Sequence, residues 1–158
     1  MIQYIHGDIF QSTMQTLVCP VNTVGVMGKG LALQFAERFP GLLPRYKWRC
    51  NVTYPHDPSY RFRAGMTWLC RSGGWNPEWD KWIICFATKG HWRVLSELEY
   101  IETGLQKIAR LYEIQGITSI AFPKLGCGLG RLAWPDVKLL FDKYLDLIDI
   151  PVEVYIYD

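Results

Sequence analysis

Three glycine-bearing segments of this 158-residue chain have the composition of loops that bind phosphate or sugar oxygens. They are Gly7-Asp8-Ile9, residues 22–30 (NTVGVMGKG) and residues 126–131 (GCGLGR). Glycine lets the main chain approach a ligand closely, and successive backbone amides in such a loop form a concave surface that binds anions. Asp8 adds a carboxylate that can accept a hydrogen bond from an exocyclic amine or a hydroxyl. The three loops therefore predict a ligand with phosphate and sugar groups.

Each of these loops also has an interpretation without a ligand, because aspartate and glycine are common in ordinary turns. Residues 22–30 are not a Walker A loop, since only two residues separate Gly25 from Gly28 and no serine or threonine follows Lys29. They also lack the G-x-G-x-x-G order of a dinucleotide-binding fold. Two glycine loops at one sheet edge suggest a diphosphate. A base near Asp8 and a sugar near Asn22 would then make the ligand ADP-ribose or something very like it.

The elements that position these loops alternate between strand-like and helix-like segments, as around a partly parallel sheet. The expected strands are residues 2–5, 16–21, 65–70, 82–87, 118–122 and 152–157, and the expected helices are residues 31–39, 42–50, 96–112 and 135–148. Each glycine loop then follows a strand, at the edge where open α/β sheets bind ligands. The pattern predicts an α/β sandwich without an interdomain linker.

Local signals refine two of these elements. Ser96 with Glu99 three residues later predicts a capping box at the start of the third helix. The buried stripe of that helix would consist of Leu98, Ile101, Leu105, Ile108 and Leu111. Residues 72–81 (SGGWNPEWDK) predict a hairpin-like excursion on the surface between two strands.

The composition excludes several classes of protein. With 49% hydrophobic and 20% charged residues, the chain is far from the composition of disordered proteins. It has no apolar run of about 18–20 residues and no signal-peptide layout, so we expect a soluble, cytoplasmic protein without a membrane partner. The 5 cysteines are odd in number and widely spaced, which indicates neither a disulfide framework nor a structural metal site.

The formal net charge of +2 conceals a basic segment at residues 38–71, which carries seven lysines and arginines against the single acid Asp57. Aromatic residues are interleaved with these charges: Tyr46, Trp48, Tyr54, Tyr60, Phe62 and Trp68. Such a mixture could hold phosphates and stack bases, as a nucleic-acid substrate would require. The alternative is a solvated basic face whose aromatic side chains turn into the core.

Taken together, the segments GDI (7–9), VNTVGVMGKGLA (21–32) and PKLGCGLGRLAW (123–134) resemble the macrodomain family in order and spacing over essentially the whole chain. In addition, FATKGHWR (86–93) followed by SELEYIETGL (96–105) is similar to the branch that contains the terminal ADP-ribose glycohydrolase and the antitoxin macrodomain that removes ADP-ribose from thymidine in DNA. The resemblance implies a macrodomain-like three-layer α/β/α sandwich with a mixed central sheet of about six strands, and a single domain over residues 1–158.

The resemblance also implies a role for each loop. Asp8 and Ile9 would contact the adenine, Asn22 and residues 25–30 would hold the distal ribose, and residues 126–129 would line the diphosphate. The substrate-binding residues that it implies are Gly7, Asp8, Ile9, Asn22, Thr23, Gly25, Val26, Met27, Gly28, Lys29, Gly30, Thr88, Lys89, Leu125, Gly126, Cys127, Gly128, Leu129 and Gly130. It implies no cofactor and no metal ion.

Lys89 is the catalytic residue that the resemblance implies. In this branch the matching lysine is the proposed nucleophile, which forms a covalent adduct with the distal ribose. A nucleophilic lysine must be a neutral amine, so burial or a nearby positive charge should lower its pKa. Gly130 departs from the eukaryotic glycohydrolase, in which an aspartate at this position helps to resolve the adduct. Lys124, His91 and Cys127 are further candidates for proton transfer or attack.

The implied function is binding of ADP-ribose and hydrolysis, through Lys89, of the bond between ADP-ribose and a modified target. A nucleobase in DNA is the preferred target. Two alternatives stay open, which are removal of phosphate from ADP-ribose 1″-phosphate and a reader module that binds ADP-ribose without catalysis. The implied partners are ADP-ribose or an ADP-ribosylated target, DNA, and a toxin on a separate chain.

Overall fold

The structure is a computed structural model that describes residues 1–52, 57–71 and 80–157. Within these ranges the strands are β1 (Ile2–His6), β2 (Thr16–Val21), β3 (Thr67–Cys70), β4 (Trp82–Ala87), β5 (Ile120–Pro123) and β6 (Val152–Ile156). The helices are α1 (Gly30–Arg38), α2 (Leu42–Asn51), α3 (Leu98–Leu111) and α4 (Trp134–Leu145), with short 3-10 helices at Ile9–Gln11 and Pro58–Tyr60. The predicted set of six strands and four helices is confirmed.

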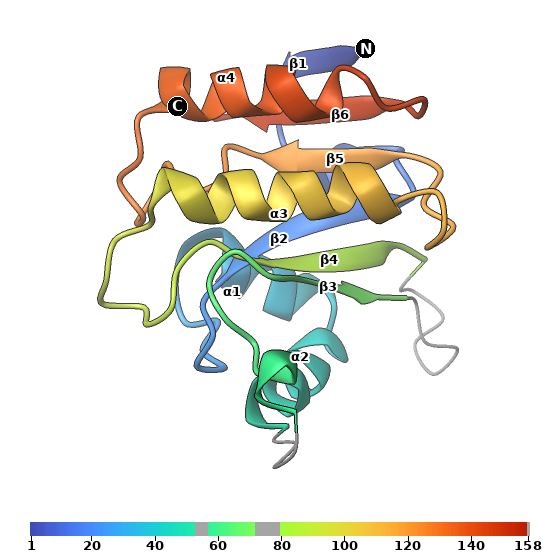
Figure 1. Cartoon of the computed structure of the whole chain (residues 1–158). Helices are drawn as coiled ribbons and strands as arrows, with labels where there is room; N and C mark the ends of the chain where they lie inside the picture. The colour runs from blue at the N-terminus through green and yellow to red at the C-terminus, as the bar shows by residue number, and fades with distance from the viewer. Residues whose placement is uncertain (53–56, 72–79, 158) are drawn as a thin grey trace.

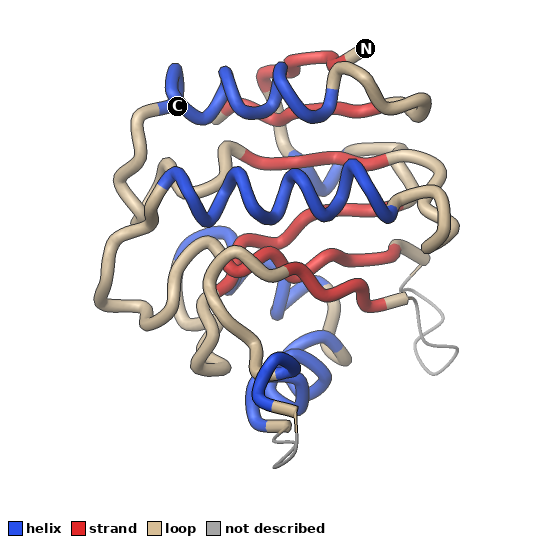
Figure 2. Tube along the Cα trace, viewed as in Figure 1, coloured by secondary structure: helices blue, strands red, loops and turns tan. Residues whose placement is uncertain are grey.

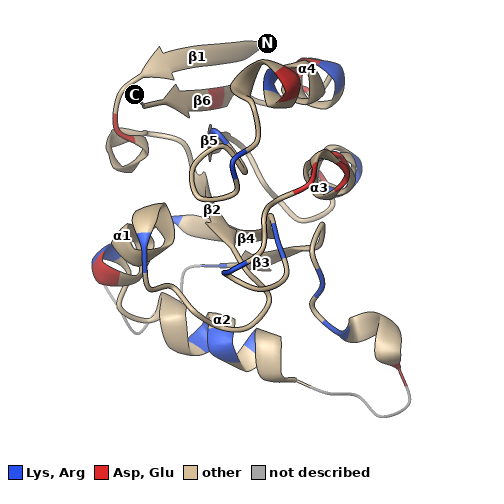
Figure 3. Ribbon diagram, turned by 90° about the vertical axis from the view of Figure 1, so that its left-hand side faces the viewer, with Lys and Arg blue, Asp and Glu red and all other residues tan. Residues whose placement is uncertain are grey.

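The strands form one sheet in the order β1-β6-β5-β2-β4-β3 (Figure 1). The pairs β1 with β6, β6 with β5, β5 with β2 and β2 with β4 are parallel, and β3 alone pairs antiparallel with β4 in the described sheet. The sheet is therefore mixed, as predicted. Because the five parallel strands point the same way, the loops that follow them lie at one edge of the sheet, which faces the viewer in Figure 3.

Helices cover both faces of the sheet, which makes three layers (Figures 2 and 3). Neighbouring residues of β2 show the division, because side chains alternate between the faces of a strand. Cys19 belongs to the core cluster that contains Phe35 of α1 and Tyr46 of α2. Val18 belongs to the cluster of α3 and α4, with Phe141 among its members. The predicted α/β/α sandwich is confirmed.

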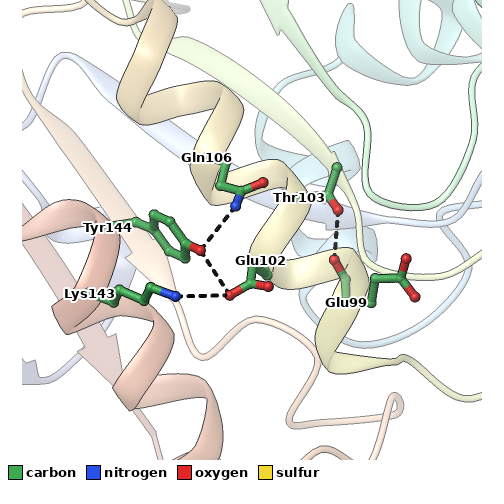
Figure 4. A network of polar contacts seen from close by, with 6 residues as sticks. All are labelled: Glu99, Glu102, Thr103, Gln106, Lys143 and Tyr144. Atoms are coloured by element: carbon green, nitrogen blue, oxygen red, sulfur yellow. Dashed lines mark hydrogen bonds and ion pairs between the residues drawn. The ribbon is translucent and has the colours of Figure 1, made fainter.

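Polar side chains also link α3 to α4 (Figure 4). The Tyr144 hydroxyl donates to Glu102 at 2.9 Å, and the Gln106 amide donates to the same hydroxyl oxygen at 3.0 Å. Lys143 lies 3.7 Å from the Glu102 carboxylate, in a pair that is largely exposed. Exposed pairs of this kind contribute little to stability, so the helices are held mainly by their apolar contacts with the sheet.

The start of α3 differs from the prediction. The helix begins at Leu98 with Glu97 as its N-cap, and no side chain caps its first turn, so the predicted capping box of Ser96 and Glu99 is wrong. Ser96 instead donates its backbone N–H to the carbonyl of Gly130 at 3.2 Å. Ser96, which the local sequence predicts as part of the helix cap, therefore contacts a distant loop instead. Leu98, predicted in the buried stripe, is the first residue of the helix and is 39% exposed.

Other boundaries shift by a few residues. β2 and β4 have the predicted bounds, whereas the expected helix over residues 135–148 ends at Leu145. Most of the predicted excursion at residues 72–81 lies outside the described residues, as does Tyr54, although the antiparallel pairing of β3 with β4 is that of a hairpin. In the described ranges, every helix is too short or too polar to cross a membrane.

Gly104→Ala is expected to lower the free energy of unfolding by about 1–3 kcal/mol. α3 lies so close to β4 at this buried glycine that a Cβ atom would overlap the Phe86 ring, with Cε2 only 2.6 Å away. Helix propensity alone would make the same substitution stabilising by about 1 kcal/mol, so the sign measured by urea unfolding tests the packing. The double variant Gly104→Ala with Phe86→Leu should recover part of the loss. Parental stability of the single variant would contradict this account.

Candidate functional site

A cleft of about 920 Å³ opens at the carboxyl ends of β2, β4 and β5. The loops that follow these three strands, together with the first residues of α1, form its walls. Twelve predicted binding residues line it: Asn22, Val26, Gly28, Lys29, Gly30, Thr88, Lys89, Gly126, Cys127, Gly128, Leu129 and Gly130. The structure therefore brings the second and third glycine loops and Lys89 to one cavity.

The first glycine loop lies in an adjoining hollow of about 420 Å³. Gly7 and Asp8 line this hollow with Gln34, and Leu31 and Tyr157 belong to both the hollow and the cleft. Asp8 also has the structural role considered above, because its carboxylate accepts the backbone N–H of Phe10 at 2.9 Å and caps a 3-10 helix. The two spaces together provide an elongated site with Asp8 near one end.

Five predicted binding residues support the walls without lining either space: Ile9, Thr23, Gly25, Met27 and Leu125. Met27 and Leu125 are buried in the core, and the fully buried Ile9 donates its backbone N–H to the Tyr157 hydroxyl at 3.2 Å. Gly25 has φ +85° and lies against Lys47 of α2, so it shapes the turn. A motif marks a loop, but the fold decides which of its residues face inward.

The predicted binding set omits several residues that line the site: Pro20, Val21, Leu31, Ala32, Gln34, Trp92, Arg93, Pro123, Lys124 and Tyr157. Some of them were detectable in principle. Pro20, Val21 and Pro123 end the parallel strands β2 and β5, whose carboxyl ends meet at the binding edge. Tyr157, just beyond β6, carries no motif, and only the position of β6 beside β1 brings it to Asp8.

The buried Asn22 side chain holds the second glycine loop in place. Its Oδ1 accepts the backbone N–H of Val24 at 3.0 Å, and its Nδ2 donates to the carbonyl of Val26 at 2.8 Å. Tyr46 of α2 donates its hydroxyl to the same Oδ1 at 2.6 Å. Since Oδ1 is engaged by the protein itself, Asn22 shapes the loop, and only its remaining amide hydrogen can reach a ligand.

The loop after β4 carries Lys89 and is tied to the second glycine loop. Both the backbone N–H and the hydroxyl of Thr23 donate to the carbonyl of Gly90, at 2.8 and 3.0 Å. Lys89 Nζ donates to the carbonyl of Trp92 at 3.2 Å. Burial lowers the pKa of the Lys89 amine, which increases its neutral fraction. This direction is the one that a nucleophilic lysine requires.

The cleft is electropositive. Four cationic side chains line it, from Lys29, Lys89, Arg93 and Lys124, and none of the described residues in its lining is aspartate or glutamate. Walls with charges of one sign attract an oppositely charged ligand into a cleft. Lysines and arginines are visible on loops at this end of the molecule in Figure 3. The site therefore favours an anion.

Two of the reserve candidates are less suited to attack or proton transfer. Burial raises the pKa of the Cys127 thiol to about 11, so this side chain is protonated near neutral pH. His91 does not line the cleft, and its Nδ1 accepts the backbone N–H of Arg93 at 3.0 Å. The described residues also hold no group of three or more His, Cys, Asp or Glu side chains placed to bind a metal ion.

Part of the basic segment at residues 38–71 has a structural role. Tyr46 and Phe62 are buried, and the Arg49 guanidinium, 4% exposed, lies 4.9 Å from the centre of the Phe62 ring. Arg38 lies over the Phe10 ring at 4.4 Å. The alternative interpretation, with aromatic side chains in the core, thus describes these residues. None of the described residues of this segment lines the cleft.

Residues 18–141, a range that includes the second and third glycine loops and Lys89, match the family described as Macro domain. The chain belongs to the Macro domain family. It is 38% identical over 161 residues to a Thermosipho africanus protein named DNA ADP-ribosyl transferase-DNA ADP-ribosyl glycohydrolase fusion protein, with 98% of this chain and 42% of that protein covered. The family predicted from the motifs is confirmed.

Solved structures give the same picture. Thermosipho africanus DarTG in complex with ADP-ribose superimposes with a TM-score of 0.87 at 37% identity, covering 98% of this chain and 41% of that one. The macrodomain of Thermus aquaticus DarG gives a TM-score of 0.83 at 35% identity, covering 100% of this macrodomain and 98% of that chain. The chain spans about two-fifths of the length of the first curated relatives it matches.

Gly130 has no room for a side chain in this macrodomain. An added Cβ would overlap Ser96 Oγ and would lie 2.7 Å from the carbonyl oxygen of Gly126. Ser96 is 6% exposed, and its Oγ is buried without a hydrogen-bond partner among the described residues. The close approach of the α3 entry to the third glycine loop therefore requires glycine at this position.

Gly130→Ala is accordingly expected to lower the free energy of unfolding by about 1–3 kcal/mol in urea denaturation. Ser96→Ala should have an effect near zero, because it removes a buried hydroxyl that makes no hydrogen bond. In combination, Ser96→Gly should relieve part of the Gly130→Ala loss. A stable Gly130→Ala protein, or an equally large loss in Ser96→Ala, would contradict the steric explanation.

Proposed function

We propose that this macrodomain binds ADP-ribose and hydrolyses the bond that joins ADP-ribose to a modified target. The adenine lies in the hollow beside Asp8 and Tyr157, the diphosphate lies on residues 126–130, and the distal ribose lies between the second glycine loop and Lys89. The observation that carries the proposal is a cleft with two glycine loops and four cations but no acidic lining residue in the described chain. A dianionic diphosphate fits these charges.

The third glycine loop is suited to the diphosphate. A Cβ added to Gly128 would meet nothing within 4 Å, so the main chain at this point is open to an approaching group. Gly126 has φ +74°, a conformation that brings the loop back toward the cleft and that other residues adopt rarely. Lys124 lies at the start of the loop and lines the same cleft. Backbone amides and a lysine together can bind phosphate oxygens.

Lys89 supplies the chemistry in this proposal. The lone pair of its neutral Nζ attacks the anomeric carbon of the distal ribose, and the bond from that carbon to the target breaks. The electron pair of that bond leaves with the target, which takes up the proton that the alkylated Nζ gives up. Water then adds to the ribose carbon, the bond to Nζ breaks, and ADP-ribose and the free amine are released. The partly buried position of Lys89 and its lowered pKa support this role.

A nucleobase in DNA is the proposed target. The support comes from the relatives, which are named DNA ADP-ribosyl glycohydrolase or its fusion with a DNA ADP-ribosyl transferase. A transferase of that kind, on the same or a separate chain, is the proposed source of the modified DNA and the proposed toxin partner. The excess of positive charge in the cleft is consistent with a substrate that carries phosphates beyond the diphosphate itself.

Lys89→Ala should reduce release of ADP-ribose from ADP-ribosylated DNA by at least about a hundredfold. ADP-ribose binding, measured by calorimetry, should persist, because the glycine loops are unchanged. Lys143→Ala, on the exposed surface of α4, is the matched control and should act like the parent protein. Parallel assays use ADP-ribosylated protein and ADP-ribose 1″-phosphate.

The outcomes separate the alternatives. Undiminished release by Lys89→Ala would contradict the lysine mechanism. Binding of ADP-ribose by the parent protein without release from any substrate would indicate a reader module, and activity on ADP-ribose 1″-phosphate alone would indicate a phosphatase.

The pH dependence of hydrolysis provides an independent prediction. The protonated amine of Lys89 cannot attack, so kcat/KM should rise with pH and level off at a lysine pKa below the usual value of about 10.4. The single-turnover profile measured between about pH 6 and pH 10 should therefore rise with pH, with its midpoint shifted below that of an ordinary lysine. A rate that falls steadily as the pH rises would contradict attack by the neutral amine.

A further inference from the structure

We infer that the Trp92 side chain stacks on the base next to the modified nucleotide, and thereby selects a nucleic-acid strand over a smaller ADP-ribosylated target. This inference rests on the proposed function and specifies which residue recognises the strand. Base stacking on an aromatic side chain is tolerant of sequence because every base offers a π face. Trp92 thus takes the role that the composition of residues 38–71 first suggested for that segment.

The surroundings of Trp92 are those of a stacking surface. Trp92 lines the cleft and 44% of it remains exposed, so part of its side chain is accessible to a ligand in the cleft. The Arg93 guanidinium lies 4.6 Å from the centre of the indole, and the His91 ring lies 4.9 Å away at an interplanar angle of 32°. The Arg93 guanidinium covers part of the indole and supplies a cation for a phosphate, and the part of the indole that stays exposed supplies the π surface for a base.

Hydrogen bonds hold this group at the mouth of the cleft. The backbone N–H of Val94 donates to the carbonyl of His91 at 3.1 Å and closes a turn around Trp92. The same loop is tied to the second glycine loop by the two hydrogen bonds from Thr23 to Gly90. The backbone of Trp92 therefore has a defined position relative to the wall that is proposed to hold the distal ribose.

The hydrogen bond from Lys89 places Trp92 beside the proposed reaction site. Lys89 Nζ donates to the carbonyl of Trp92, so the base that leaves must lie close to the backbone of this residue. The exposed indole projects from the same residue and meets the next base along the strand. An acidic protein side chain that carries ADP-ribose offers no π face for this contact, whereas a DNA strand offers both bases and phosphates.

Another exposed tryptophan provides a comparison. Trp48 of α2 is 55% exposed and lies 6.4 Å from the Trp68 ring, but it does not line the cleft. Its exposure is similar to that of Trp92, but it lies away from the cleft. A general effect of surface tryptophans on DNA binding would act through both residues, whereas the proposed contact acts through Trp92 alone.

The experiment compares two substrates in each variant. One is a single-stranded oligonucleotide with one ADP-ribosylated base, and the other is the same ADP-ribosylated nucleoside without neighbours. In Trp92→Ala, the ratio of kcat/KM for the oligonucleotide to kcat/KM for the nucleoside should fall roughly tenfold, about the contribution of stacking one base. Trp92→Phe should keep most of the parental ratio because it retains an aromatic face, and Trp48→Ala should keep all of it.

Each result bears on a different statement. A parent protein that releases ADP-ribose from neither substrate would overturn the proposed function and this inference with it. If the parent protein turns over both substrates and Trp92→Ala preserves the ratio, the stacking contact is overturned while the proposed function stands. Equal losses on both substrates would also overturn it, since Trp92 would then act only on the common reaction.

Discussion

The parallel pairing of β2 with β4 and β5 is the constraint on which the site depends. Val21 lies opposite Ala87 at the ends of β2 and β4, and the N–H of Thr88 continues the ladder by donating to the Val21 carbonyl at 3.0 Å. The second glycine loop and Lys89 therefore leave the sheet side by side. β5 adds the third glycine loop from the other flank of β2. Sheet hydrogen bonds thus assemble a cleft from segments that lie up to about a hundred residues apart.

The cleft favours an anion because cations line its walls and carboxylates are missing from its described lining residues. The buried Oδ1 of Asn22 is engaged by Val24 and Tyr46, so the second glycine loop is held by the protein without a charged group. The cations in the lining have no carboxylate beside them among the described residues of the cleft. An anion is then the natural counterpart of the site, while burial of Lys89 favours its neutral form.

Close approach is a second theme of the molecule. Gly104 lets α3 lie against Phe86 of β4, and Gly130 lets the residue before α3 reach the third glycine loop. A side chain has no room at either position. The Phe86 ring fills the space beside Gly104, and Ser96 with the Gly126 carbonyl fills the space beside Gly130. Position 130 therefore has no room for an aspartate side chain beside Ser96. Both the site and the core therefore require a glycine where two segments approach each other closely.

The resemblance of three motifs to a known family predicted the family and most of the residues in the cleft. The apolar pattern predicted the order of elements, because glycine loops after strands and alternating burial are local properties of a chain. Tertiary structure decided the rest. It drew Ser96 away from the helix cap, directed Met27 and Leu125 into the core, and brought Tyr157 beside Asp8 through the pairing of β1 with β6. These outcomes depend on contacts between segments that lie far apart in the sequence. A local pattern of residue types does not specify which side chains will make such contacts.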